Sequence, residues 1–309
     1  VQRIFLAGNT AMQLLFAGRP VNGLASAPFR PDTLFRDRKG DRLYNIPVSY
    51  APCVSGFVGG DITAGLLASG LWQRRGNFLF LDIGTNGEMA LGGADGFLCC
   101  SVASGPAFEG GGISCGMPGM DGAVSHVRYD RGFLYDVIGG GPAKGLCGSG
   151  LLDLTAELLR LGLLDESGRL LPPEEAPAEL RRYLYRDGSG NGLFRLTADA
   201  ALTAGDVRSL QLAKAAVAAG IRVLLEQRGL TAEQLDGIYL AGGFGTCLSP
   251  DSAAAIGMLP AMPRDRLHSL GNTALAGAAM AAADTEMKRR MAAVADSCRY
   301  IELAGREDF

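Results

Sequence analysis

The residues best suited to chemistry lie in one stretch, Asn77 to Gly92. The apolar run from Phe78 to Leu81 predicts a buried strand that ends in Asp82. Gly84-Thr85-Asn86-Gly87 then predicts the tip of a β-hairpin, with Asn86-Gly87 supplying positive φ angles. Backbone N–H groups bared by glycine, beside a hydroxyl, suit phosphate oxygens, and a carboxylate at a strand end suits hydrated Mg²⁺. From these residues alone, an ordinary hairpin with a solvated aspartate is an equal alternative.

Asp61 is a second acid with two interpretations. It follows the glycine-rich stretch 54–60 and precedes the apolar helical stretch 62–69. Capping that helix would explain an aspartate here, and the spacing alone favours this interpretation. The competing interpretation is a general base or a water-orienting group, because Asp61 lies about twenty residues before the phosphate hairpin.

Further glycine-dense segments follow the hairpin. The loop 103–120 contains one acid, Glu109, which could face a metal or a substrate. Gly148-Ser149-Gly150 opens a helix over 151–160 and offers free N–H groups, and Cys147 beside it is expected to be a packed thiol. A strand with a glycine pair covers 237–245, and a helix of small residues covers 271–283.

The remaining elements are read from periodicity and caps. A helix is expected over 11–17 with Asn9 or Thr10 as its cap, and a long helix over 207–227, which is a candidate dimer interface. A last short strand is expected over 300–304. Residues 165–192 have the composition of a connector or insertion.

Composition and charge argue against a membrane protein and against a nucleic-acid-binding protein. The 309 residues are 48% hydrophobic and include 45 glycines, and no apolar run approaches the roughly 20 residues needed to span a bilayer, so a membrane protein is not expected. The net charge of −3 provides no basic surface for nucleic acid. Seven cysteines without a C-x-x-C pair suit a reducing cytoplasm, and two distant histidines make a histidine metal site or triad improbable. The chain opens directly on a strand without Met, which we interpret as a piece of a longer protein.

The order of the glycine turns resembles the nucleotide-binding frame of the sugar kinase, Hsp70 and actin superfamily. Residues 60–69 also resemble the helix that carries the catalytic aspartate of hexokinases, which favours the catalytic interpretation of Asp61. More narrowly, the chain resembles from end to end the C-terminal ATPase region of the reductive activators of corrinoid proteins. The matching segments are Leu6–Met12, Gly56–Asp61, Asp82–Glu88, Gly105–Gly110, Leu146–Asp153, Leu210–Ala215, Leu240–Gly245 and Tyr300–Ala304.

The resemblance implies an α/β fold of the actin/Hsp70/sugar-kinase (ribonuclease H-like) type, with two lobes around a nucleotide cleft. Residues 1–75 would be the remainder of an incomplete first lobe with a connecting helix. Residues 76–309 would be the second lobe, with the phosphate hairpin and the adenosine motif.

The resemblance also implies roles for single residues. Asp61 and Asp82 would be catalytic, Asp61 orienting the attacking water and Asp82 holding Mg²⁺ through water, with Glu109 a further candidate metal ligand. The residues that would contact ATP are Gly84, Thr85, Asn86 and Gly87 at the phosphates, Gly148, Ser149 and Gly150 along the nucleotide, and Gly242, Gly243 and Phe244 at the adenosine.

In the family, ATP turnover is coupled to reduction of a Co(II) corrinoid to Co(I) by electrons from a [2Fe–2S] domain. The expected partner is a corrinoid iron–sulfur protein or a corrinoid methyltransferase. Neither the [2Fe–2S] domain nor the family's first phosphate loop is present in this chain, so we expect the isolated fragment to be inactive. The alternatives are a small-molecule kinase of the same superfamily, in which Asp61 would deprotonate a hydroxyl, and a non-catalytic module that docks a corrinoid protein.

Overall fold

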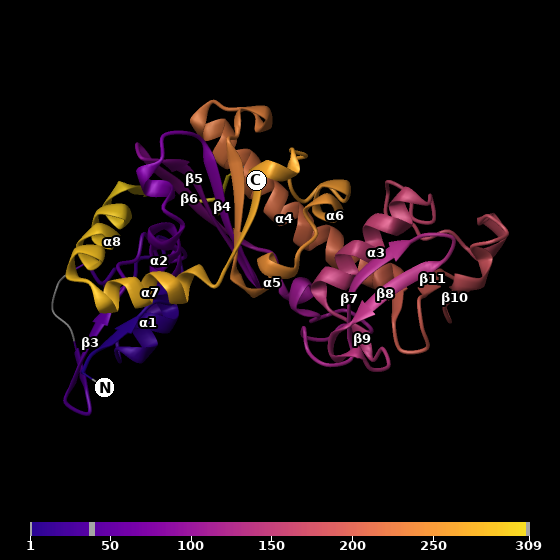
Figure 1. Ribbon diagram of the computed structural model, residues 1–309, viewed down its shortest axis with the longest axis horizontal. Helices are drawn as coiled ribbons and strands as arrows, with labels where there is room; N and C mark the ends of the chain where they lie inside the picture. Colours follow the sequence, from indigo (N-terminus) through magenta and orange to yellow (C-terminus); the bar gives the residue numbers. More distant parts are fainter. Residues whose placement is uncertain (1, 37–40, 307–309) are drawn as a thin grey trace.

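A mixed sheet lies in the middle of the elongated molecule (Figure 1). The computed structural model describes residues 2–36 and 41–306. The strand order in this sheet is β14-β13-β4-β5-β6-β15. Strands β4 (Phe78–Ile83), β5 (Asn86–Gly93) and β6 (Gly96–Ala103) form an antiparallel meander. Strands β13 (Gly237–Ala241) and β14 (Leu267–Gly271) extend the sheet in parallel beyond β4, and β15 (Cys298–Tyr300) pairs in parallel with β6.

The central strand β4 is apolar except at Asp82, because both faces of the sheet are covered. Side chains alternate between the faces of a strand, so Phe78 and Phe80 pack on one side and Leu79 and Leu81 on the other. Helix α2 (Gly60–Ser69) covers the first face and helix α4 (Ala204–Arg228) the second. The predicted hairpin is therefore confirmed.

Helix α4 begins as a capping box in which Thr203 and Asp206 exchange hydrogen bonds. Its apolar positions, including Leu210, Val217 and Leu224, are buried in the core of the chain. The stripe that made this helix a candidate dimer interface is thus occupied within one chain.

The N-terminal segment forms a small sheet in the order β1-β3-β2, with β1 (Ile4–Leu6), β2 (Asp41–Leu43), β3 (Ile46–Tyr50) and helix α1 (Thr10–Phe16). The predicted cap is confirmed, since the Asn9 side chain accepts from the Met12 N–H. Helices α7 (Thr273–Ala283) and α8 (Thr285–Ser297) return from the other end of the chain to lie beside α2 (Figure 1). A side chain at Gly277 would overlap the Ala64 carbonyl, so the small residues of α7 serve close helix packing, as predicted.

The far end of the molecule holds helix α3 (Gly148–Arg160) and two small sheets (Figure 1). Their strands are β7 (Ala123–Tyr129), β8 (Phe133–Val137), β9 (Gly145–Leu146), β10 (Leu184–Arg186), β11 (Gly192–Arg195) and β12 (Ala201–Thr203). Strand β10 lies inside the predicted connector 165–192, because Leu184 is buried opposite Phe194 of β11. The last strand is also displaced from the prediction, since it ends at Tyr300.

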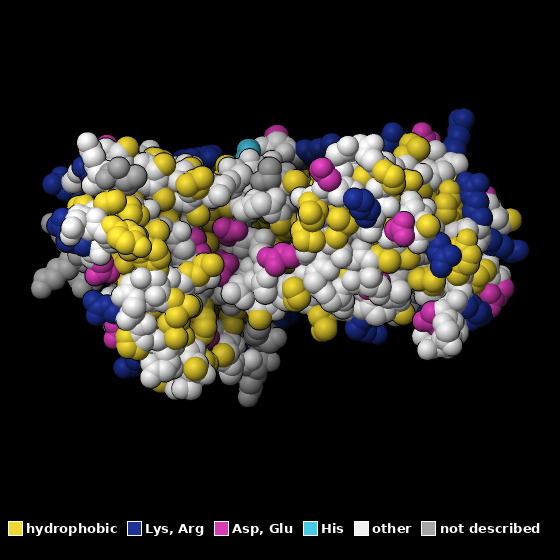
Figure 2. Space-filling view, turned by 90° about the horizontal axis from the view of Figure 1, so that it is seen from below, with side chains coloured by type: hydrophobic (Ala, Val, Ile, Leu, Met, Phe, Trp, Pro, Cys, Tyr) yellow, Lys and Arg dark blue, Asp and Glu magenta, His cyan; other side chains and the backbone are white. Residues whose placement is uncertain are grey.

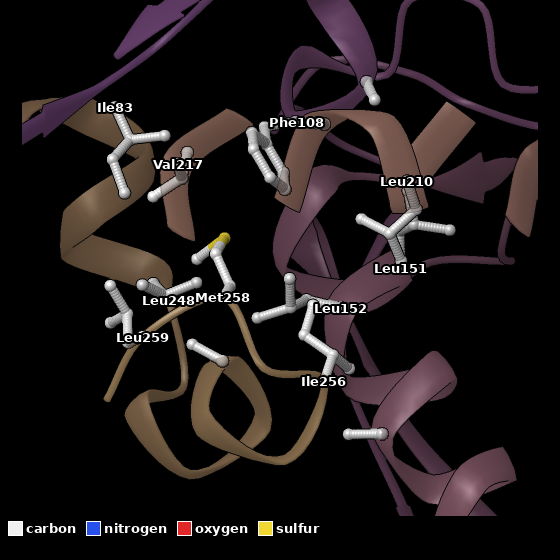
Figure 3. Close-up of a cluster of buried hydrophobic side chains, with 14 of the residues drawn as sticks. Ile83, Phe108, Leu151, Leu152, Leu210, Val217, Leu248, Ile256, Met258 and Leu259 are labelled. Carbon is white, nitrogen blue, oxygen red and sulfur yellow. The ribbon is translucent and has the colours of Figure 1, made fainter. Parts of the chain in front are cut away.

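One hydrophobic core joins the hairpin to the helices that follow it. Ile83 of the hairpin and Phe108 point toward α3, α4 and the segment after the short helix α5 (Gly242–Cys247), which includes α6 (Pro250–Ala255) (Figure 3). Leu152 and Met258 lie at the centre of this cluster and are almost completely buried. The core thus fixes the position of the β4–β5 hairpin relative to α5. Within residues 2–36 and 41–306, no helix has the length and apolarity that crossing a bilayer requires.

Candidate functional site

The carboxyl end of β4 places Asp82 at the start of the hairpin turn. In the antiparallel register Asp82 lies opposite Glu88 of β5, and Glu88 lies opposite Ser101 of β6. Asp82 is half-buried, and burial raises the pKa of its carboxyl group above the ordinary value. A carboxyl group in this position ionises more readily when a cation is close.

Asp61 approaches the hairpin from helix α2. Helix α2 begins at Gly60 with Gly59 as its N-cap, so the capping interpretation of Asp61 is wrong. The N–H groups of Gly60 and Asp61 donate to the Gly8 carbonyl at 2.9 and 3.2 Å, which ties the helix start to the turn after β1. Burial, with a smaller contribution from the charge of Asp82, raises the pKa of Asp61 to about 6. The two residues predicted to be catalytic are therefore close enough to interact electrostatically.

Glu88 is a third acid of this site, and it was not among the residues predicted from the sequence. Burial, together with the charges of Asp61 and Asp82, raises the pKa of Glu88 to about 8. The hairpin pattern could have identified Glu88, because residues equally distant from a tight turn face each other across the two strands, and Glu88 is the residue opposite Asp82. Figure 2 shows acidic side chains gathered near the middle of one face of the molecule.

The predicted phosphate turn is built differently from the prediction. Asn86 and Gly87 are the first residues of β5, and neither has a positive φ, so the assignment of positive φ angles to Asn86-Gly87 is wrong. The turn consists of Gly84 and Thr85, closed by the Gly84 N–H donating to the Asn86 carbonyl at 2.9 Å. Gly87 is buried, and a side chain there would crowd Val102, whereas Thr85 and Asn86 are exposed. Exposed N–H and hydroxyl groups are thus concentrated at Thr85.

The glycine pair after β13 lies directly against Asp82. Gly242 has a φ of +80°, and a Cβ atom there would overlap the Asp82 carboxylate oxygen Oδ1. This position therefore accepts no residue larger than glycine without movement. Gly243 is exposed, with open space where a Cβ would lie. Phe244 stacks on Phe108, with ring centroids 4.9 Å apart and planes inclined at 21°.

The predicted Gly148-Ser149-Gly150 segment does begin helix α3, but all three residues are buried. A Cβ atom at Gly148 would overlap the Phe108 carbonyl and lie 2.9 Å from the Phe244 ring, so this residue borders the Phe108–Phe244 stack. Gly150 lies against the Val124 carbonyl, and the Ser149 hydroxyl donates to the Ser125 carbonyl at 2.8 Å. Gly148 is thus adjacent to the site, whereas Ser149 and Gly150 face β7. Cys147 is buried, and its Sγ donates to the Val124 carbonyl at 3.3 Å, as expected of a packed thiol.

The donor set is suited to a hydrated cation. Among the described residues, no group of three or more His, Cys, Asp or Glu side chains could enclose a metal ion. Mg²⁺ commonly keeps several waters and binds through one or two carboxylates plus phosphate oxygens. Asp82, with acids nearby whose pKa values are raised, fits this second arrangement.

Comparison with known proteins identifies the family of the chain. A family model described as the C-terminal domain of RACo, the ASKHA domain, matches residues 76–309, and one described as the RACo middle region matches residues 1–74. A corrinoid activation enzyme, RamQ of Eubacterium limosum, is 36% identical over 267 residues, covering 83% of this chain and 45% of the relative. A reductase of the Co(II) methylated amine-specific corrinoid protein, from Methanosarcina barkeri, is 26% identical over 314 residues, covering 89% of this chain and 54% of the relative.

A solved structure of a reductive activator for a corrinoid iron–sulfur protein superposes with a TM-score of 0.87 at 34% identity. The match covers 98% of this chain and 50% of that protein. The chain thus spans about half the length of the relatives it matches. The predicted ASKHA-type fold, which is that of actin, Hsp70 and the sugar kinases, is confirmed. The chain belongs to the RACo family, whose middle region and C-terminal ASKHA domain it contains.

Proposed function

We propose that this chain is the ATP-binding and ATP-hydrolysing part of a larger cytoplasmic protein that reductively activates a corrinoid protein, from Co(II) to Co(I). The relatives named above, which act on corrinoid proteins, support the substrate class. The observation that carries the nucleotide part is the contact of Gly242 with Asp82. It brings the adenosine motif onto the acid of the phosphate hairpin, across about 160 residues of sequence.

The proposed roles follow from the positions of the groups. Thr85 receives the terminal phosphates beside Gly84, which has no side chain to obstruct them, and Asn86 and Gly87 support the turn from β5. Gly243 leaves room for the adenosine beside Phe244, Gly242 lets the same motif lie against Asp82, and Gly148 borders the aromatic pair. We assign Ser149 and Gly150 a supporting role, because both pack on β7.

Asp61 is proposed to orient and deprotonate the attacking water. A pKa of about 6 makes its carboxylate a stronger base than an ordinary aspartate and still mostly ionised at neutral pH. Asp82 is proposed to hold Mg²⁺ through water. When bound, Mg²⁺ would neutralise phosphate charge and lower the mutual repulsion of the acids.

The rest of the proposal concerns the longer protein. Its electron carrier would be a [2Fe–2S] cluster on a domain outside this chain, and its partner a corrinoid iron–sulfur protein or a corrinoid methyltransferase. We also propose that residues 1–75 belong to the first lobe and residues 76–309 to the second, and that the isolated chain is inactive.

Calorimetry and phosphate release test the nucleotide part. Mg·ATP should bind the full-length protein, and Asp61→Asn should retain binding but lose at least about a hundredfold in hydrolysis, since it removes a general base. Asp82→Asn should lose the Mg²⁺ dependence of binding. Asp95→Asn is the matched control, because Asp95 is exposed in the turn between β5 and β6. Absence of binding to this chain and to the full-length protein would refute the ATPase and favour a docking module, and a phosphorylated small molecule would favour a kinase.

A further inference from the structure

The carboxylate of Glu109 lies on the phosphate turn. Its Oε2 accepts from the Thr85 hydroxyl at 2.7 Å, and its Oε1 accepts from the Thr85 backbone N–H at 3.2 Å. Oε1 also lies 3.4 Å from the place where a Cβ atom of Gly84 would be. The Glu109 carboxylate thus accepts both hydrogen bonds that Thr85 can donate and lies against the side of the turn where Gly84 has no side chain.

These donors are the ones that a phosphate group would need. A backbone N–H and a hydroxyl that converge beside a glycine form a small anion-binding site. A carboxylate presents two anionic oxygens in a similar spread, so it satisfies the same donors in the absence of phosphate. A carboxylate and a phosphate cannot share the site, because like charges in contact repel each other.

The backbone around Glu109 is held in place, whereas its side chain is exposed. Glu109 ends the short helical turn η3 (Pro106–Glu109), which is bracketed by Gly105 and Gly110 with φ angles of +74° and +82°. Phe108 is buried and stacks on Phe244, which fixes the turn to α5. Releasing Thr85 therefore requires rotation of the Glu109 side chain only.

We infer that Glu109 is a resident competitor for the nucleotide's phosphates, a positioning residue that holds Thr85 while the site is empty and swings away when a triphosphate enters. This inference rests on the proposed function, and it replaces the role of Glu109 as a candidate metal ligand. Competition lowers the affinity for phosphate-bearing ligands and leaves adenosine unaffected. It also keeps the turn in its binding conformation between turnovers.

The test measures binding of Mg·ATP and of adenosine to the full-length protein by calorimetry. Glu109→Gln and Glu109→Ala should each bind Mg·ATP about tenfold more tightly than the wild type, because each removes one negative charge at contact distance. Adenosine should bind all three proteins equally. Glu179→Gln is the matched control and should bind like the wild type. Glu179 is an exposed glutamate in the segment that precedes β10, and β10 lies at the far end of the molecule (Figure 1).

The outcomes separate this inference from the proposed function. Equal binding of Mg·ATP by the wild type and both Glu109 variants would overturn the inference and leave the ATPase intact. Weaker binding by the variants would also overturn it and would restore Glu109 as a metal ligand. If no variant binds nucleotide, both the inference and the proposed function fail.

A second measurement tests the resting contact without nucleotide. In hydrogen exchange, the Thr85 amide should exchange more slowly in the wild type than in Glu109→Ala, because Glu109 accepts its N–H. Unchanged exchange at Thr85 would overturn the proposed hold on the turn. Exchange in the Phe108 segment should be the same in both proteins, which controls for a general loss of structure.

Discussion

Replacing Glu88 with glutamine tests whether burial and the neighbouring acids of the site oppose the ionisation of Glu88. Glu88 is half-buried, lies directly opposite Asp82, and is also affected by the charge of Asp61. Glutamine keeps the size of the side chain and removes its charge. We therefore expect Glu88→Gln to stabilise the protein, by an amount that depends on pH.

The magnitude follows from the pKa of Glu88, which rises from an ordinary 4.5 to about 8 in the folded protein. Each pKa unit corresponds to about 1.4 kcal/mol, so the ceiling is about 5 kcal/mol. Solvent reaches part of the side chain, so we expect about 2–3 kcal/mol. Because the folded state favours the protonated acid, the cost of ionisation is absent below pH 4.5. It grows as the pH rises toward 8 and is constant above that.

The assay is urea unfolding of the wild type and Glu88→Gln at pH 5 and pH 9, followed by circular dichroism in the absence of Mg²⁺. The free energy of unfolding of the variant should exceed that of the wild type by about 2–3 kcal/mol more at pH 9 than at pH 5. Glu179→Gln, an exposed glutamate, should show the same difference at both pH values. A difference for Glu88→Gln that does not grow with pH would refute this prediction, since neither burial nor the neighbouring acids would then oppose the ionisation of Glu88.

Two further predictions concern packing. Gly242→Ala should lower the free energy of unfolding by about 1–3 kcal/mol, because its Cβ would overlap Asp82 at a positive φ, while Gly243→Ala, in open space, should change it little. Thermal unfolding measures both, and equal losses in the two variants would contradict the close approach to Asp82. Leu152→Ala should cost about 2–5 kcal/mol in urea unfolding, because Leu152 is completely buried between α3 and the hairpin core. A loss below about 1 kcal/mol would show that the core in Figure 3 is loosely packed.

Much of the local structure could be predicted from the sequence. The apolar run of β4, the Asn9 cap of α1 and the apolar stripe of α4 each depend on residues a few positions apart. Periodicity and capping are short-range effects, so the sequence carries them directly. The family could also be predicted, because its glycine turns recur in a fixed order along the chain.

The composition of the site depends on long-range packing. The sequence could not show that Asp61 lies near Asp82, since that requires α2 to cover the sheet and the Gly8 carbonyl to accept from its first residues. Strand register brings Glu88 into the same site.

Glycine illustrates the same limit most clearly. The sequence marks Gly150 and Gly242 alike as candidate nucleotide contacts, yet Gly150 lies against the Val124 carbonyl and Gly242 against the Asp82 carboxylate. A glycine in the sequence indicates that space is restricted or that φ is unusual. It does not indicate which group fills the space. The group that packs against each glycine depends on the order of the strands and the packing of the helices. Both arise from the burial of apolar surface over the whole chain.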